Sequence, residues 1–193
     1  MTVVWMVFEA ALAISAGVVA GSALLVAFGL DSIVELVSGG ILLWRLSVEA
    51  HGGSRSRVEA AERRARWVVA LALAVLCAYV LVTSLYGLLA RVQPEASLVG
   101  IGVSLAAAAF MPYLFWRKRR LARALGSPAL HEEAASSLTC GYMAAAVLVG
   151  VGLNAALGWW WAENIAALVF LVWLARETRE ALDAARNAES DES

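Results

Sequence analysis

The chain has 193 residues, of which 62% are hydrophobic and only 16% are charged, and its mean hydropathy is +0.75. A typical soluble domain is roughly 45–50% apolar and about 25% charged, and a chain this short leaves much of its surface exposed. This composition excludes an ordinary soluble domain, and the net charge of −1 gives no indication of a nucleic-acid partner. The excess of apolar residues predicts that the chain lies in a lipid bilayer.

Six segments are long and apolar enough to be spanning helices, which need about 20 mostly apolar residues each. Gly21-Ser22, Gln93-Pro94-Glu95 and Gly158 are turn signals between them. The predicted helices in chain order cover 3–20, 22–46, 67–89, 96–116, 128–157 and 159–180. The sequence thus predicts an all-α, six-helix transmembrane bundle over 1–185. A disordered acidic tail over 186–193 follows, with no C-terminal soluble domain expected.

Basic residues concentrate on one side of the predicted bundle. Fourteen of the fifteen lysines and arginines lie at or after the second, fourth and sixth helices, and only Arg91 lies on the opposite side. Because cytoplasmic loops carry an excess of Lys and Arg, both termini are predicted to be cytoplasmic, in a bacterial-type plasma membrane. This topology rule explains the basic runs without a specific lipid-binding function.

Two acidic residues lie inside the second predicted helix. Asp31 lies nine residues after Ser22, about 14 Å into the membrane, and Glu35 lies one turn further on the same helix face. A charge at the centre of a spanning helix costs roughly 2.5–3.5 kcal/mol, and the same span has no lysine or arginine near the pair. The pair therefore predicts a cation site at which metal and protons compete. The alternative is a protonated pair that is hydrogen-bonded to its neighbours.

The fifth predicted helix contains candidate partners for this pair. Ser136 and Cys140 lie four residues apart on one face, and Cys140 has a depth similar to that of Asp31. Carboxylates together with a thiolate suit a divalent transition metal. His131 and Glu133 lie at the cytoplasmic start of this helix, where they could attract the ion. The alternative for each of these residues is an ordinary small or surface position in a helix.

Other polar residues in the apolar segments are less informative. Glu9 of the first helix could face the same cavity or lie nearer the cytoplasmic interface. Asn154 could hydrogen-bond across helices, and Glu163 is expected near the outer surface because it follows three interfacial tryptophans. No nucleophile–base pair, phosphate-binding loop or HExxH motif indicates an enzyme, so no catalytic residue and no permanent cofactor is predicted.

The stretch Gly29–Glu35, GLDSIVE, resembles helix two of the cation diffusion facilitator family. In that family a DSxxD-like pair supplies half of a tetrahedral metal site, and Asp31 and Glu35 fall on its two positions. Residues 158–168 resemble the start of the family's helix six, usually an acid-proline followed by apolar residues. The resemblance covers nearly the whole chain and is closest to a short branch that has the transmembrane domain alone.

The stretch Glu133–Cys140 resembles the start of the family's helix five, where His and Asp ligands follow an acid at three and seven residues. Ser136 and Cys140 occupy those ligand positions here, and Glu35 replaces the shorter Asp of helix two. The resemblance therefore implies a metal site of Asp31, Glu35, Cys140 and Ser136.

The resemblance implies a homodimer that exports a divalent metal ion from the cytoplasm in exchange for protons. Four ligands around one ion favour a zinc-like, tetrahedral site, with cobalt, cadmium, iron or manganese as the other possible cargo ions. The fifth helix lacks both the family's His and its Asp. A non-transporting metal-binding membrane scaffold or modulator is therefore the alternative function.

Overall fold

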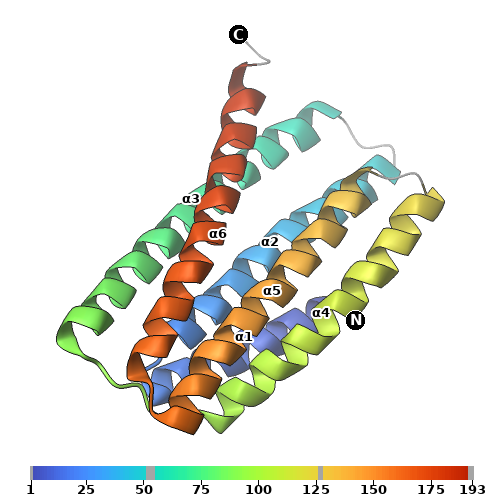
Figure 1. Cartoon of the computed structure of the whole chain (residues 1–193). Helices are drawn as coiled ribbons and strands as arrows, with labels where there is room; N and C mark the ends of the chain where they lie inside the picture. Colours follow the sequence, from blue (N-terminus) through green and yellow to red (C-terminus); the bar gives the residue numbers. More distant parts are fainter. Residues whose placement is uncertain (1, 51–54, 126–127, 191–193) are drawn as a thin grey trace.

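The computed structural model describes residues 2–50, 55–125 and 128–190, and within these ranges the chain forms six helices and no strand. The helices are α1 (Thr2–Ala20), α2 (Ala23–Ala50), α3 (Arg55–Ala90), α4 (Leu98–Leu125), α5 (Pro128–Leu157) and α6 (Trp160–Ser190). They run up and down as one elongated bundle (Figure 1). The predicted all-α, six-helix class is therefore confirmed.

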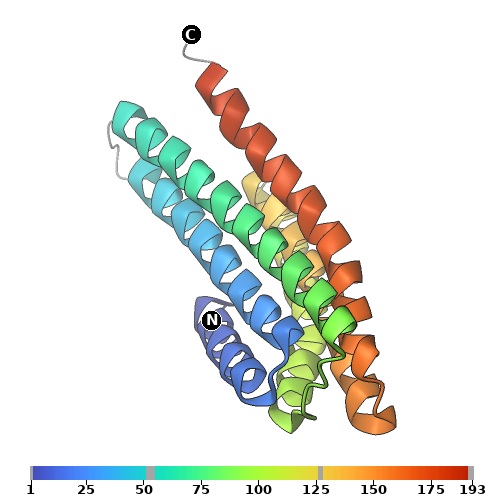
Figure 2. The ribbon, with the colours of Figure 1, turned by 90° about the vertical axis from the view of Figure 1, so that its left-hand side faces the viewer.

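The helices associate mainly as three pairs, α1 with α2, α3 with α6, and α4 with α5. Contacts of α2 with α3 and of α5 with α6 join these pairs, and α2 also touches α5 and α6. Figure 2 shows that α3 and α6 both extend beyond the other helices at the end that carries the C-terminus, where they diverge from each other. Because α2 has neighbours on several sides, its polar residues can lie inside the bundle.

At the end of the bundle opposite the C-terminus, the connections from α1 to α2, from α3 to α4 and from α5 to α6 are short. Gly21 and Gly158 both have a φ of +65°, a left-handed conformation that glycine adopts without steric strain. The backbone N–H of Glu95, between α3 and α4, donates to the carbonyl of Ala20 at 2.8 Å. We call this end of the molecule the turn end, and the opposite end, where α4 carries residues 117–120, the basic end.

The outer surface of the bundle is apolar. Val19, Leu89 and Leu98 are 83%, 85% and 83% exposed, whereas Phe28 and Phe170 are buried between helices. Each of α1 to α5 contains a stretch long and apolar enough to cross a membrane. The apolar stretch of α6 is shorter, because Glu163 lies before it and Arg176 lies after it. Such a surface is suited to lipid, in which helices satisfy their own backbone hydrogen bonds.

Four helices are longer at the basic end than hydropathy predicts, and the first of them, α2, continues to Ala50. α3 begins at Arg55, α4 continues to Leu125, and α6 continues to Ser190. The disorder predicted from residue 186 onward therefore does not apply to 186–190, while 191–193 lie outside the described residues. The helices extend further because these end segments are rich in Ala, Arg and Glu, which are good helix formers. Low hydropathy shows where a helix leaves the lipid, and the helix itself continues into water.

Candidate cation site

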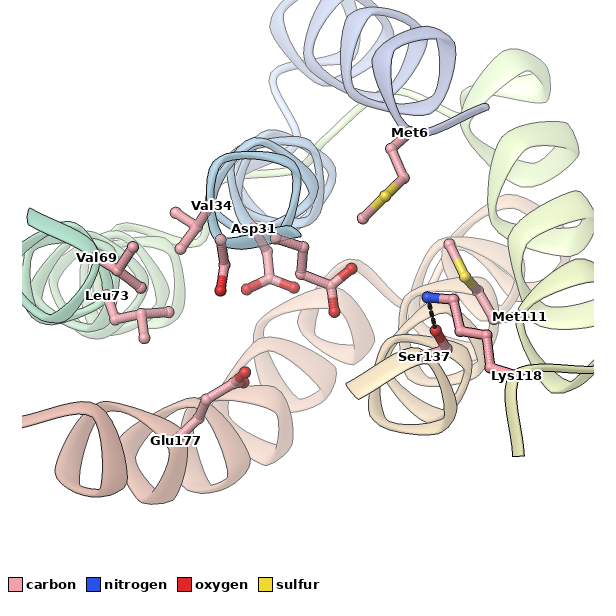
Figure 3. Close-up of a pocket in the computed structure, with 11 residues that line it drawn as sticks. Met6, Asp31, Val34, Val69, Leu73, Met111, Lys118, Ser137 and Glu177 are labelled. Carbon is pink, nitrogen blue, oxygen red and sulfur yellow. Dashed lines mark hydrogen bonds between the residues drawn. The ribbon is translucent and has the colours of Figure 1, made fainter. Parts of the chain in front are cut away.

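Asp31 and Glu35 of α2 line a single cavity of about 50 Å³. All six helices contribute side chains to its wall, and there is room for a few water molecules or a partly hydrated ion. Asp31 is 3% exposed, and Figure 3 shows its carboxylate pointing into the cavity, with Glu177 of α6 on the far side. The one-turn spacing of the two acids on α2 thus places both on the face that is turned toward the bundle interior.

Cys140 of α5 lies next to this acid pair. Its side chain is fully buried, and its thiol is within hydrogen-bonding reach of the Glu35 carboxylate. It is also close enough to Asp31 and Glu9 for an electrostatic interaction. Neither Cys140 nor Cys77 is in a disulfide. The contact between α2 and α5 therefore places the thiol of Cys140 beside Glu35 and within electrostatic range of Asp31.

The remaining residues proposed from the sequence cannot be placed in the same way. The side chains of His131, Glu133 and Ser136 lie outside the described residues, although their backbone is part of α5. The next residue along, Ser137, is described and lines the cavity. The ligand role of Ser136 and the entry role of the other two remain predictions.

A basic side chain reaches the cavity as well. Lys118 of α4 lines the same cavity as Asp31, and its Nζ donates a hydrogen bond to Ser137 Oγ at 2.7 Å (Figure 3). Although α2 itself has no lysine or arginine near Asp31 and Glu35, the acids therefore have a basic neighbour on another helix. Four consecutive residues cover nearly a full helical turn, so one member of the run 117–120 has to face inward. That geometry is the signal that could have identified Lys118.

Sequence reasoning also missed Glu177, which it grouped with the charged extension of the last helix. The packing of α6 against α3 and α2 turns this side chain toward Asp31, and the two carboxylates interact electrostatically. The carboxylates of Glu35, Glu177 and Glu9 thus all act electrostatically on that of Asp31. Such a concentration of negative charge in a low-dielectric interior favours a cation.

The acidic cavity is not a preformed coordination shell. Among the side chains that the structure describes, no three of His, Cys, Asp and Glu converge closely enough to hold a metal ion. Long side chains such as that of Glu35 would have to change rotamer to coordinate one ion together with Asp31. The arrangement can therefore attract a cation before it coordinates one.

Glu9 of α1 faces the bundle interior, although it is not among the residues that line the cavity. Its side chain is only 2% exposed, and Ser32 Oγ donates to its Oε1 at 3.2 Å. Ser32 directly follows Asp31 on α2, so Glu9 belongs to the same region of the protein.

A comparison with protein families identifies the fold. The family model of the cation efflux transmembrane domain matches residues 2–185. The chain belongs to this family. It is therefore an integral membrane protein and a cation transporter of the cation diffusion facilitator kind, a family whose cargo is divalent metal cations. A search among curated proteins finds no significant match.

At its turn end, this cation efflux domain is held together by another buried carboxylate. Glu163 of α6 is 2% exposed and accepts hydrogen bonds from Ser22 Oγ at 2.5 Å and Asn154 Nδ2 at 2.8 Å. The bond from Asn154 of α5 to Glu163 of α6 confirms that Asn154 hydrogen-bonds across helices, and Asn154 also donates to the carbonyl of Pro94 at 3.0 Å. The network links the α1–α2 turn, the segment before α4, α5 and α6.

Proposed function

We propose that the protein is a divalent metal–proton antiporter that exports the ion from the cytoplasm. The observation that carries this proposal is that two carboxylates of α2, Asp31 and Glu35, share a buried cavity to which α5 presents the thiol of Cys140. Charged groups inside a membrane protein are costly to maintain, and they usually mark an ion pathway.

The ligand chemistry follows from these side chains. Two carboxylates balance the charge of a divalent ion, and Cys140 with Ser136 or a water molecule would complete a four-coordinate, zinc-like shell. Cobalt, cadmium, iron and manganese are the other candidates, since carboxylate and thiol donors accept all of these ions to different degrees. A proton that binds a carboxylate removes the charge that holds the metal, and this competition is the basis for exchange.

The direction of transport is inferred from the position of the charges. Lysine and arginine concentrate at the basic end, which the positive-inside rule makes cytoplasmic together with both termini. Near that end, His131 and Glu133 would attract the incoming ion. At the opposite end, the hydrogen bonds of Glu163 and Asn154 close the bundle, so we propose that they must break when the ion leaves. The family resemblance also supports a homodimer.

The test is metal-dependent flux in proteoliposomes that contain the purified full chain. Asp31→Asn is expected to abolish metal uptake and the opposing proton movement, while Asp183→Asn, an exposed carboxylate of α6, leaves both unchanged. Full flux in the Asp31 variant would refute the proposal.

The alternative function, a metal-binding membrane scaffold or modulator, is favoured by one observation. α5 has Ser136 and Cys140 where the family resemblance expects His and Asp. Metal binding by the wild-type chain without any flux in the same vesicles would establish this alternative.

A further inference from the structure

Glu177 differs from the other charged residues in its part of α6. Its neighbours between 176 and 183 that carry a charge are exposed, namely Arg176, Arg179, Glu180 and Asp183. Glu177 is partly buried, and it lies one turn after Leu174, whose side chain is fully buried. The helix therefore directs Glu177 inward, and the presence of an acid here is not explained by a helix that has entered water.

The level of Glu177 in the bundle follows from a contact at the turn end. Ser22 donates a hydrogen bond to Glu163 there, which aligns α2 with α6, and both helices start at this end. At the rise of an α-helix, Glu35 and Glu177 lie about 20 Å and about 21 Å from that contact, and Asp31 lies about 14 Å from it. Glu177 is therefore level with Glu35 and lies on the basic-end side of Asp31.

Asp31 and Glu177 face each other across the cavity. Both residues line it, and Figure 3 shows the carboxyl group of Glu177 directed toward Asp31. Asp31 is 3% exposed, and among the residues that the structure describes neither acid has a hydrogen bond or an ion pair. A buried carboxylate that points into a cavity without a partner leaves its oxygen atoms to whatever occupies the cavity.

A divalent cation suits this cavity better than water alone. Water molecules can hydrogen-bond the carboxylates, but they do not compensate the charges that Asp31, Glu35 and Glu177 bring to a volume of about 50 Å³. Protons neutralise these acids in the metal-free protein, and a metal ion replaces them. The two acids of α2 approach such an ion from one side, and a complete shell also needs a donor from the other side, where Glu177 lies.

We propose that Glu177 is a ligand of the transported ion, contributed by α6 from the side of the cavity opposite Asp31. This inference rests on the function proposed above and adds a residue to its site. In the described part of the chain the possible ligands do not yet converge, so the long side chain of Glu177 has to move toward Asp31 when the ion binds. Because α2 and α6 have few direct contacts, the bound ion would also join the α1–α2 pair to the α3–α6 pair.

The experiment measures the binding of Mn²⁺ and Zn²⁺ to the purified full chain in detergent, by competition with a metal-binding dye. Glu177→Gln keeps the size of the side chain but removes the charge and a ligand oxygen, so both affinities should fall at least tenfold. Glu177→His also removes the carboxylate but offers an imidazole of similar length, which suits Zn²⁺ better than Mn²⁺. The Zn²⁺ affinity of this variant should return to within threefold of wild type, while its Mn²⁺ affinity stays at least tenfold lower.

Glu180 provides the matched controls, because it is an exposed acid three residues further along α6. Glu180→Gln and Glu180→His should leave both affinities unchanged. An effect of Glu177 through its charge alone predicts instead that Glu177→Gln and Glu177→His weaken the binding of the two ions equally.

The possible results separate this inference from the proposed function. If the wild-type chain binds neither ion, the proposed function fails, and this inference fails with it. If the wild-type chain binds both ions and the Glu177 variants bind them as tightly, the function stands and the role of Glu177 is refuted. Equal losses for the two ions in Glu177→His overturn coordination by this residue, and selective recovery of Zn²⁺ supports it. That comparison is made within one variant, so it remains valid if Glu177→Gln does not fold.

Discussion

Lys118 of α4 and Ser137 of α5 are joined by a hydrogen bond of 2.7 Å on the wall of the cavity that contains Asp31. The ammonium group therefore lies at the edge of a region that is otherwise rich in carboxylates. A fixed positive charge at this place compensates some of the negative charge when no metal is bound, and it opposes the entry of a divalent ion.

Removal of this positive charge should strengthen metal binding. For Lys118→Met we expect a three- to tenfold higher affinity for Zn²⁺, because the cavity then has more uncompensated negative charge. Isothermal titration of the protein in detergent measures this change, and Lys118→Arg, which keeps the charge, is the control. An unchanged or weaker affinity in the Met variant would show that the lysine does not act on the ion.

The thiol of Cys140 should determine how well soft ions bind. Cys140→Ser replaces sulfur by oxygen at a fully buried position, so the affinity for Cd²⁺ should fall by at least tenfold, more than the affinity for Mn²⁺. Cys77→Ser, which changes the other cysteine on α3, is the control and should leave both affinities unchanged. Equal losses for the two ions in Cys140→Ser would contradict direct coordination by sulfur.

Metal affinity should decrease as the pH falls below neutrality. Protons and the metal compete for the carboxylates of Asp31 and Glu35, so a lower pH favours the protonated, metal-free protein. A titration of metal binding at several pH values measures this effect. Asp31→Asn, which has one titrating group fewer, should show a weaker pH dependence of its residual binding. A pH-independent affinity in the wild-type chain would exclude competition between protons and metal.

Asn154 should stabilise the turn end. Its Nδ2 bonds both Glu163 and the carbonyl of Pro94, so Asn154→Ala leaves a buried carboxylate oxygen without this donor. We expect the free energy of unfolding to fall by about 1–3 kcal/mol. The loss would appear as a lower midpoint of thermal unfolding in detergent. Ala155→Ser, on the exposed side of the same helix, should be nearly neutral.

The close packing of α5 against α6 depends on Gly150. A Cβ atom at this position would lie 2.8 Å from the Cβ of Ala166, closer than two carbon atoms can approach, so Gly150→Ala should destabilise the protein by about 1–3 kcal/mol. Gly152→Ala is a matched control, since nothing lies within 4 Å of the place that a Cβ atom would take there, and it should be neutral or slightly stabilising. Equal thermal midpoints for the two variants would contradict this account of the packing.

Much of the architecture could be predicted because lipid imposes simple rules on a chain. Runs of about 20 apolar residues have to form helices, and glycines such as Gly21 and Gly158 allow tight turns between them. The ends of helices at the basic end were harder to predict, as the start of α3 at Arg55 shows. Hydropathy reports the boundary of the membrane, whereas helix formation depends on backbone hydrogen bonds that continue beyond it.

The sequence alone determined the helical class, the positions of the turns and the placement of Asp31 and Glu35 on one face of α2, since each follows from local composition or from spacing within a single helix. Only the tertiary structure decided that Cys140 meets Glu35, that Glu9 faces inward, and that Lys118 and Glu177 reach the same cavity. These contacts join different helices, whose relative rotation is set by the packing of small and large side chains around Phe28 and Phe170. In helices that are apolar on nearly every face, hydrophobic periodicity gives no indication of that rotation.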